Sequence, residues 1–146
     1  MSGWLLDTNI ISAFAPGRPP PPQRVATWFE VNTDALFLSA VTVAEVVAGI
    51  ARLRRGGAAA RSASLEQWFD RIVDLYGDRI LPFDARAGRL AGEMTDLALA
   101  RGHTPGFADT AIGAIAQARS LTVLTANLRH FQPLGVAVHD PFAANQ

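Results

Sequence analysis

Short runs of apolar residues alternate with longer amphipathic stretches along most of the chain. The short runs have the length and character of strands that are buried on both faces. We expect strands at residues 4–6, 36–38, 80–81, 121–124 and 136–138. The longer stretches carry apolar side chains at helical spacing and predict helices over residues 10–15, 23–31, 41–54, 58–76, 85–100 and 108–119, with a short turn at 128–131. This alternation predicts an α/β fold, with helices on both faces of a parallel sheet.

Capping and breaking residues mark the ends of several predicted helices. Ser39 or Thr42 can accept a hydrogen bond from the first turn of the helix that follows, and Asp84 can do so for a later helix. The pair Gly56-Gly57 separates two long helices. Residues 19–22 are all proline, so this stretch is neither a regular helix nor the interior of a sheet.

The composition is that of one globular domain. The chain has 146 residues, of which 49% are hydrophobic and 18% are charged. These values differ from those of disordered sequences, and a domain usually has about 100 to 200 residues. We expect a single domain at residues 1–142 and a frayed tail at residues 143–146.

All 13 basic residues are arginine, and the chain contains neither lysine nor cysteine. Without cysteine, the chain can form no disulfide, thiolate zinc site or iron–sulfur cluster, and it has no thiol nucleophile. Without lysine, it has no Walker phosphate loop, no Schiff-base chemistry and no kinase-type lysine. Carboxylates, hydroxyls, histidine and arginine remain as the groups that can do chemistry.

Positive and negative charges balance, with 13 basic and 13 acidic residues. A polyanion would therefore have to bind to local groups of arginines, because the chain has no overall basic field. No apolar run reaches the length of about 18 residues that a membrane span needs. The first residues also lack the basic and apolar regions of a secretory signal, so we expect a cytoplasmic protein without a membrane segment.

Four polar residues stand where predicted strands end or predicted helices begin. Asp7 follows the first strand and Asn127 the fourth, Glu45 lies on the helix after the second strand, and Asp109 opens the helix before the fourth. In an open parallel sheet, ligands bind beyond the carboxyl ends of the strands, so we expect one shared site. Each residue alone also has an ordinary explanation: Asp7 as a helix cap, Asp109 as a partner of the helix dipole and Glu45 as a solvated side chain.

Three converging carboxylates without a lysine repel one another unless a cation binds between them. Oxygen ligands select a hard ion, here Mg²⁺ or Mn²⁺, which keeps open positions for a phosphate. Such an ion polarises a phosphodiester and activates water, so the arrangement predicts phosphodiester hydrolysis. We expect Thr8, Thr125 and Asn127 to hydrogen-bond the carboxylates or the waters around the ion.

Two groups of arginines are candidates for contact with nucleic acid. The basic end of the third predicted helix carries Arg52, Arg54 and Arg55, and the proline run is flanked by Arg18 and Arg24. Either group could hold a phosphate backbone. For Arg52 and Arg55, a solvated helix end favoured by the dipole is an equally good explanation. Arg61 is expected to be an ordinary surface charge.

Four segments follow one another in the order of a known set of motifs. They are LLDTNIIS at residues 5–12, LSAVTVAE at 38–45, ADTAIGAIA at 108–116 and LTANLRHF at 124–131. The set resembles the motifs of the PIN-domain ribonucleases, specifically the VapC toxin family and its FitB-like branch. The resemblance extends over nearly the whole chain, from Leu5 to Pro141.

The resemblance implies a PIN-like three-layer α/β/α sandwich with a central, mostly parallel sheet of four to five short strands. It implies that Asp7, Glu45 and Asp109 bind Mg²⁺ or Mn²⁺, with Asn127 at the fourth polar position of the catalytic site. The implied activity is that of a metal-dependent endoribonuclease, the toxin of a toxin–antitoxin pair. The implied partners are an RNA substrate, a cognate antitoxin protein, promoter DNA reached only through the antitoxin, and a second copy of the chain in a homodimer.

The fourth segment departs from the family's pattern. FitB-like members commonly read Thr-Arg-Asn followed by Asp-Phe, whereas this chain has Ala126 and His130 at the Arg and Asp positions, and many other members carry an acid where Asn127 stands. These differences keep open a non-catalytic PIN-fold module that binds a protein in an apolar groove. A phosphatase of the haloacid dehalogenase type is disfavoured, because Asn9 replaces its second aspartate and lysine is absent.

Overall fold

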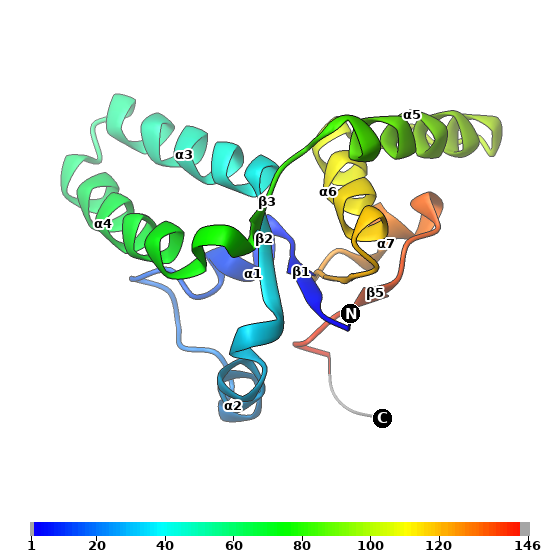
Figure 1. Cartoon of the computed structure of the whole chain (residues 1–146). Helices are drawn as coiled ribbons and strands as arrows, with labels where there is room; N and C mark the ends of the chain where they lie inside the picture. Colours follow the sequence, from blue (N-terminus) through cyan, green and yellow to red (C-terminus); the bar gives the residue numbers. More distant parts are fainter. Residues whose placement is uncertain (1, 144–146) are drawn as a thin grey trace.

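Five short parallel strands form the central sheet of the computed structural model, which describes residues 2–143 (Figure 1). The strands are β1 (Trp4–Leu6), β2 (Leu36–Ser39), β3 (Ile80–Leu81), β4 (Thr122–Leu124) and β5 (Val138–His139). Their order across the sheet is β3-β2-β1-β4-β5, and all four pairings are parallel. The chain thus builds one side of the sheet with β2 and β3 and then crosses to the other side of β1. The point where the order reverses lies between β1 and β4, and this is where α/β sheets bind ligands.

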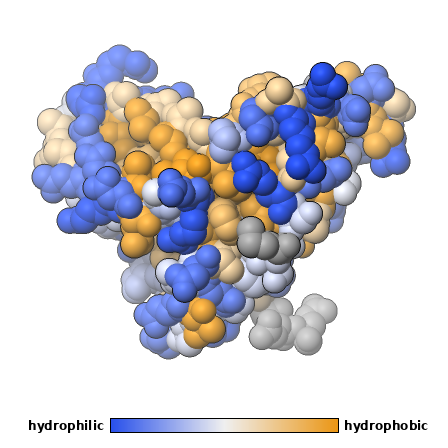
Figure 2. Space-filling view, viewed as in Figure 1, coloured by the Kyte–Doolittle hydropathy of each residue, from blue (hydrophilic) through white to orange (hydrophobic). Residues whose placement is uncertain are grey.

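Within residues 2–143, seven α-helices surround the sheet. They are α1 (Thr8–Ser12), α2 (Gln23–Val31), α3 (Ala40–Arg55), α4 (Ala59–Tyr76), α5 (Ala85–Ala100), α6 (Phe107–Ala118) and α7 (Leu128–Phe131). Helices α3 and α4 form a hairpin on one side of the molecule, and α5 and α6 pack together on the other side (Figure 1). Between these two parts the outline is notched, and hydrophobic surface gathers there (Figure 2). None of the helices in the described part combines the length and the apolar character that crossing a membrane would require.

Alternate residues of the central strands enter two separate hydrophobic cores. Leu5 and Val123 belong to the core beneath α5 and α6, and neither has exposed surface. Leu6 and Leu124 belong to the core beneath the helices that precede β3. A strand that is covered on both faces needs an unbroken apolar run, which explains the short hydrophobic segments of the sequence. The predicted three-layer α/β/α arrangement with a parallel sheet is confirmed.

Two predicted helix caps are present. The Ser39 side chain accepts a hydrogen bond from the backbone N–H of Thr42 at 3.0 Å, so Ser39 rather than Thr42 is the cap of α3. The Asp84 side chain accepts one from the backbone N–H of Ala87 at 3.0 Å, at the start of α5. These bonds satisfy backbone donors that a helix leaves without partners in its first turn.

Some predicted boundaries were wrong. The helix expected at 10–15 begins at Thr8, because the cap is the residue directly after β1. The last strand was expected at 136–138 but is Val138–His139, since its partner β4 ends at Leu124, which is paired with His139. Of the predicted tail at 143–146, only the first residue is described, so this prediction lies outside the described residues.

Candidate functional site

The ends of β1 and β4 bring two side chains together that are 118 positions apart in the sequence. Asp7 follows β1 and its backbone N–H donates to the carbonyl oxygen of Leu124 at 2.9 Å, which extends the pairing of the two strands. Thr125 follows β4 and is fully buried. Both residues thus lie at the carboxyl edge of the sheet, where the strand order reverses.

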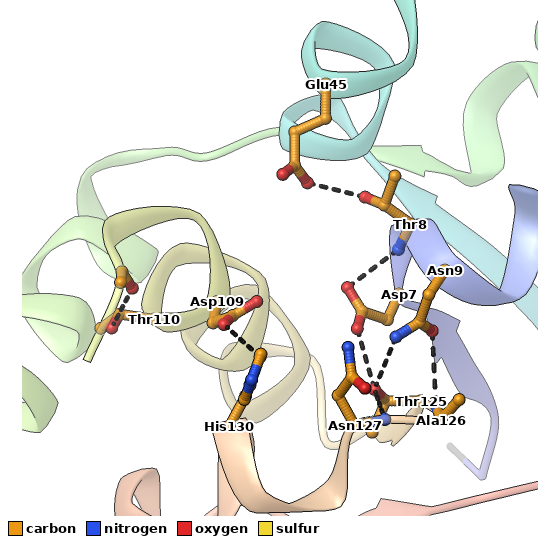
Figure 3. Close-up of polar contacts among 11 residues, drawn as sticks. Asp7, Thr8, Asn9, Glu45, Asp109, Thr110, Thr125, Ala126, Asn127 and His130 are labelled. Carbon is orange, nitrogen blue, oxygen red and sulfur yellow. Dashed lines mark hydrogen bonds and ion pairs between the residues drawn. The ribbon is translucent and has the colours of Figure 1, made fainter. Parts of the chain in front are cut away.

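Asp7 is buried, with 5% of its surface exposed, and both of its carboxylate oxygens accept hydrogen bonds (Figure 3). Oδ1 accepts from the backbone N–H of Thr8 at 2.8 Å, and Oδ2 accepts from the hydroxyl of Thr125 at 2.8 Å. The first of these bonds caps α1. The ordinary explanation of Asp7 as a helix cap is therefore correct, and it does not compete with a place in the site.

Burial raises the pKa of Asp7 above its ordinary value of 3.8, because a carboxylate loses hydration there. The hydrogen bonds from Thr125 and Thr8 act in the opposite direction. The negative charges of Asp109 and Glu45 raise the pKa further. The charges of Asp109 and Glu45 thus act on Asp7 across the same space.

Glu45 reaches this region from α3. The hydroxyl of Thr8 donates to Glu45 Oε1 at 2.7 Å (Figure 3). The hydroxyl oxygen of Thr8 also lies 3.1 Å from the hydroxyl oxygen of Thr42. Thr42 is in turn 3.2 Å from the hydroxyl of Ser39, and both of these residues are fully buried. A row of hydroxyl groups thus connects the cap of α3 to the carboxylate, and the predicted hydrogen bond from Thr8 to an acid is confirmed.

Asp109 lies in the first turn of α6, and His130 of α7 reaches it from the side. His130 Nδ1 is 3.2 Å from Asp109 Oδ2 (Figure 3). The side chain of Asp109 is 28% exposed and that of His130 is 59% exposed, so water surrounds much of this pair. The sequence did not indicate this contact, although His130 stands where FitB-like members commonly carry an aspartate.

Thr125 is the centre of a small hydrogen-bond network at the end of β4. Its oxygen accepts from the backbone N–H of Asn127 at 2.9 Å and lies 3.4 Å from Asn9 Nδ2. Asn9 also accepts from the backbone N–H of Ala126 at 3.3 Å through its Oδ1. We had not predicted this role for Asn9; its spacing of two residues from Asp7 was the available signal. The side chain of Asn127 is exposed beside this network.

All four predicted catalytic residues line one open pocket of about 430 Å³. Its walls are formed by Asp7, Thr8, Asn9, Ser12, Glu45, Gly106, Ala108, Asp109, Asn127 and His130. We call this space the acidic pocket. Arg52 and Arg55 are not part of it, because both are exposed near the far end of α3. The structure thus places these two arginines away from the acids.

The oxygen-rich donors of the acidic pocket suit a hard divalent cation. The mutual repulsion that raises the pKa of Asp7 is also of the kind that a cation relieves. Within residues 2–143, however, no three His, Asp or Glu side chains stand close enough together to form a ready-made ion-binding group. Glu45 is bonded to Thr8, and Asp109 is paired with His130.

A separate apolar groove of about 350 Å³ lies between the segment after β1, α2 and α4. Its walls include Phe14, Phe29 and Ile72, and Arg79 lies at its border. The guanidinium of Arg79 donates to the carbonyl oxygens of Thr33 and Leu36 at 2.7 Å and 2.8 Å. The lining of the groove is therefore largely apolar, and the guanidinium of Arg79 is fixed beside it by hydrogen bonds.

Comparison with known proteins assigns this architecture. The profile of the PIN domain family matches residues 4–134. The protein named toxin FitB from Neisseria gonorrhoeae is 37% identical over 139 residues, which are 94% of this chain and 97% of that protein. The protein named VapC ribonuclease Y4jK from Sinorhizobium fredii is 30% identical over 139 residues, which are 94% of this chain and 96% of that one. A solved structure described as FitAB bound to an IR36 DNA fragment has a TM-score of 0.82 at 34% identity and covers 98% of both chains. The chain therefore belongs to the PIN domain family, among relatives that include the FitB toxin and a VapC ribonuclease.

Proposed function

We propose that the protein is a Mg²⁺-dependent endoribonuclease and the toxin of a toxin–antitoxin pair. The observation that carries this proposal is the acidic pocket, where Asp7, Glu45 and Asp109 line one space at the point where the strand order reverses. Membership of the PIN family and the name of the VapC ribonuclease relative support the choice of RNA as substrate.

Asp7, Glu45 and Asp109 would hold the ion, and Mn²⁺ would replace Mg²⁺ because both prefer oxygen ligands. When bound, the ion would polarise the scissile phosphodiester and make water a better nucleophile. Holding an ion here requires the acids to keep their negative charge at neutral pH. The hydrogen bonds that Asp7 accepts from Thr125 and Thr8 favour its charged form against the effect of burial.

The other polar residues of the pocket position these acids. Thr125 and the N-terminus of α1 fix the orientation of Asp7, and Thr8 holds Glu45 through its hydroxyl. Asn127 places a neutral amide at the rim, where its N–H groups can donate to a phosphate oxygen without adding negative charge. A fixed arrangement of this kind lowers the cost of reorganisation during the reaction.

The direct test is cleavage of total RNA by the purified chain with Mg²⁺ and with EDTA. We expect Asp109→Asn to lower the rate by more than about 100-fold. Asp96→Asn is the matched control, because Asp96 is an exposed acid on α5 that does not line the acidic pocket. Cleavage that survives both EDTA and Asp109→Asn would rule out the proposed mechanism.

We also propose that an antitoxin protein binds the chain and that promoter DNA is bound only through this antitoxin. The names of the FitB toxin and of the DNA-bound FitAB structure support this partnership. The apolar groove beside Phe29 and Ile72 supplies a surface that a segment of the antitoxin would cover.

We further propose a homodimer that acts on RNA in the cytoplasm. Light scattering coupled to gel filtration, with and without the protein encoded beside this chain, tests both assemblies.

The second candidate function is a non-catalytic module that binds a protein. The neutral Asn127 and the contact of His130 with Asp109 favour it, because Asn127 adds no negative charge and His130 occupies an oxygen that an ion would use. Calorimetric titration with Mn²⁺ separates the two functions. Saturable binding that Asp109→Asn removes would support the nuclease, and absence of binding would support the module.

A further inference from the structure

A second groove of about 250 Å³ opens directly beside the acidic pocket. Thr8, Ser12 and Glu45 line both spaces, so the two are neighbours. The second groove is also lined by Arg18, from the loop after α1, and by Arg61, from α4, neither of which lines the acidic pocket. We call this space the arginine groove. A strand that leaves the acidic pocket along this wall would pass from acidic to basic surroundings.

The loop that carries Arg18 leaves space for the side chain of Arg61 at Gly17. Gly17 has a φ of +86°, a conformation that side chains other than glycine rarely adopt. A Cβ atom at this position would lie 2.9 Å from Arg61 Nη1, which is closer than such contacts occur. Glycine at position 17 thus lets the guanidinium of Arg61 lie against the backbone next to Arg18.

Neither arginine forms an ion pair with a carboxylate of residues 2–143. Across residues 2–143, the ion pairs are Arg54 with Glu66 and His130 with Asp109. The side chains of Arg18 and Arg61 also make no hydrogen bond with described residues, and both are exposed. Two guanidinium groups with free donors therefore line one groove. Each guanidinium is planar, and its N–H donors match the spacing of phosphate oxygens.

We infer that the arginine groove binds the RNA strand next to the scissile bond, with Arg18 and Arg61 holding a neighbouring phosphate. This inference rests on the proposed function, since the strand enters the groove from the acidic pocket. The pocket itself repels a polyanion, so a basic site close by is needed to hold the substrate in register. The indole of Trp68 lines the same groove and offers an apolar surface to a nucleobase.

The main test is binding of a short fluorescein-labelled single-stranded RNA to the full chain in EDTA, measured by fluorescence anisotropy at several NaCl concentrations. We expect the double substitution Arg18→Gln and Arg61→Gln to weaken binding on the order of tenfold. We also expect the slope of log K against log[NaCl] to fall by about 0.7 for each lost phosphate contact. Arg71→Gln is the matched control, because Arg71 is an exposed arginine of α4 outside the arginine groove.

Cleavage in Mg²⁺ gives an independent measurement. The double variant should raise KM on the order of tenfold and leave kcat nearly unchanged, since a contact with a phosphate that does not react stabilises the bound substrate and the transition state equally. Circular dichroism and thermal unfolding check that the variants fold. Unchanged affinity, salt slope and KM would overturn the inference.

The design separates this inference from the proposed function. The binding assay needs no cleavage, so loss of RNA affinity in the double variant supports the arginine groove even if the chain proves inactive. Conversely, cleavage that depends on Asp109 while Arg18 and Arg61 have no effect would leave the nuclease in place and reject the groove. A double variant that still binds RNA normally but no longer binds polyglutamate would overturn the inference in favour of an acidic peptide.

Discussion

His130 Nδ1 lies 3.2 Å from Asp109 Oδ2, so one oxygen of an acid that would hold the ion is already in contact with another side chain. A cation bound through this oxygen would compete with His130. The side chain of His130 is 59% exposed and that of Asp109 is 28% exposed, so solvent weakens the contact. His130 is therefore expected to modulate ion binding rather than to prevent it.

Replacing His130 with alanine should tighten Mg²⁺ binding about two- to fivefold, the effect of removing an exposed pair worth up to about 1 kcal/mol. Isothermal titration calorimetry measures the change. His103→Ala is the control, because His103 is exposed in the loop before α6 and does not line the acidic pocket. Weaker Mg²⁺ binding in His130→Ala would contradict this prediction and make His130 a supporting group of the ion.

Mg²⁺ should stabilise the wild-type chain against unfolding. At a concentration about 100 times its Kd, a ligand that binds only the folded state adds about 2.7 kcal/mol to the free energy of unfolding. Differential scanning calorimetry would show this as an increase in Tm. The increase should disappear in Asp109→Asn and persist in Asp96→Asn, whose acid lies outside the pocket. Equal shifts in the two variants would indicate that Mg²⁺ binds elsewhere.

The raised pKa of Asp7 predicts how stability depends on pH without metal. Folding makes Asp7 hold its proton more tightly than in the unfolded chain, where the ordinary value is 3.8. Below pH 3.8, Asp7 is protonated in both states and does not change the free energy of unfolding. As pH rises from this value through the higher pKa of the folded state, Asp7 lowers the free energy of unfolding. In urea unfolding with EDTA, the stability of Asp7→Asn relative to wild type should increase as pH is raised from about 4 to about 7. Parallel profiles for the two proteins would contradict the assignment.

Thr125→Val should destabilise the fold and disturb Asp7 at the same time. The hydroxyl donates to Asp7 and accepts from the backbone of Asn127, so valine leaves buried polar groups without partners. We expect a loss of about 1 to 3 kcal/mol in the free energy of unfolding. Thr122→Val on the same strand is the control, since the Thr122 hydroxyl makes no hydrogen bond among the described side-chain contacts. Similar losses for both variants would assign the effect to the strand rather than to the hydroxyl.

Gly17→Ala should reduce both stability and RNA affinity. The positive φ alone costs about 1 kcal/mol for alanine, and the added Cβ would displace Arg61. Gly57→Ala provides the comparison, because Gly57 has a φ of +93° but nothing within 4 Å of the added atom. Both variants should lose stability in chemical unfolding, and only Gly17→Ala should lose RNA affinity in the anisotropy assay. Equal RNA affinities would contradict a role for the position of Arg61.

The order of strands and helices could be predicted because a strand that is buried on both faces of the sheet requires an unbroken run of apolar residues. Leu5-Leu6 before Asp7 is such an apolar run, and another precedes Thr125. Boundaries were less predictable where a single side chain decides them, as when Asp7 caps α1 and starts that helix at Thr8. That Asp7, Glu45 and Asp109 line one pocket could be expected from the order of the elements, because ligand sites of open parallel sheets lie at the carboxyl ends of the strands.

Contacts between distant segments explain what the sequence could not reveal. The placement of Arg61 against Gly17 depends on how α4 packs on the loop after α1, and no local pattern encodes it. The pairing of His130 with Asp109 likewise depends on the angle of α7 to α6. Arg52 and Arg55 are equally compatible with RNA contact and with a solvated helix end, and their exposed position agrees with both explanations.

The crossing of the chain from one side of β1 to the other has a consequence for synthesis in the cell. Asp7 emerges from the ribosome early, but Thr125, which holds it, is made only after most of the chain. Chains that end before β4 lack one of the two side-chain hydrogen bonds that orient Asp7, so prematurely terminated products should not hold this carboxylate as the full chain does. The acidic pocket is therefore completed only when most of the chain has been translated.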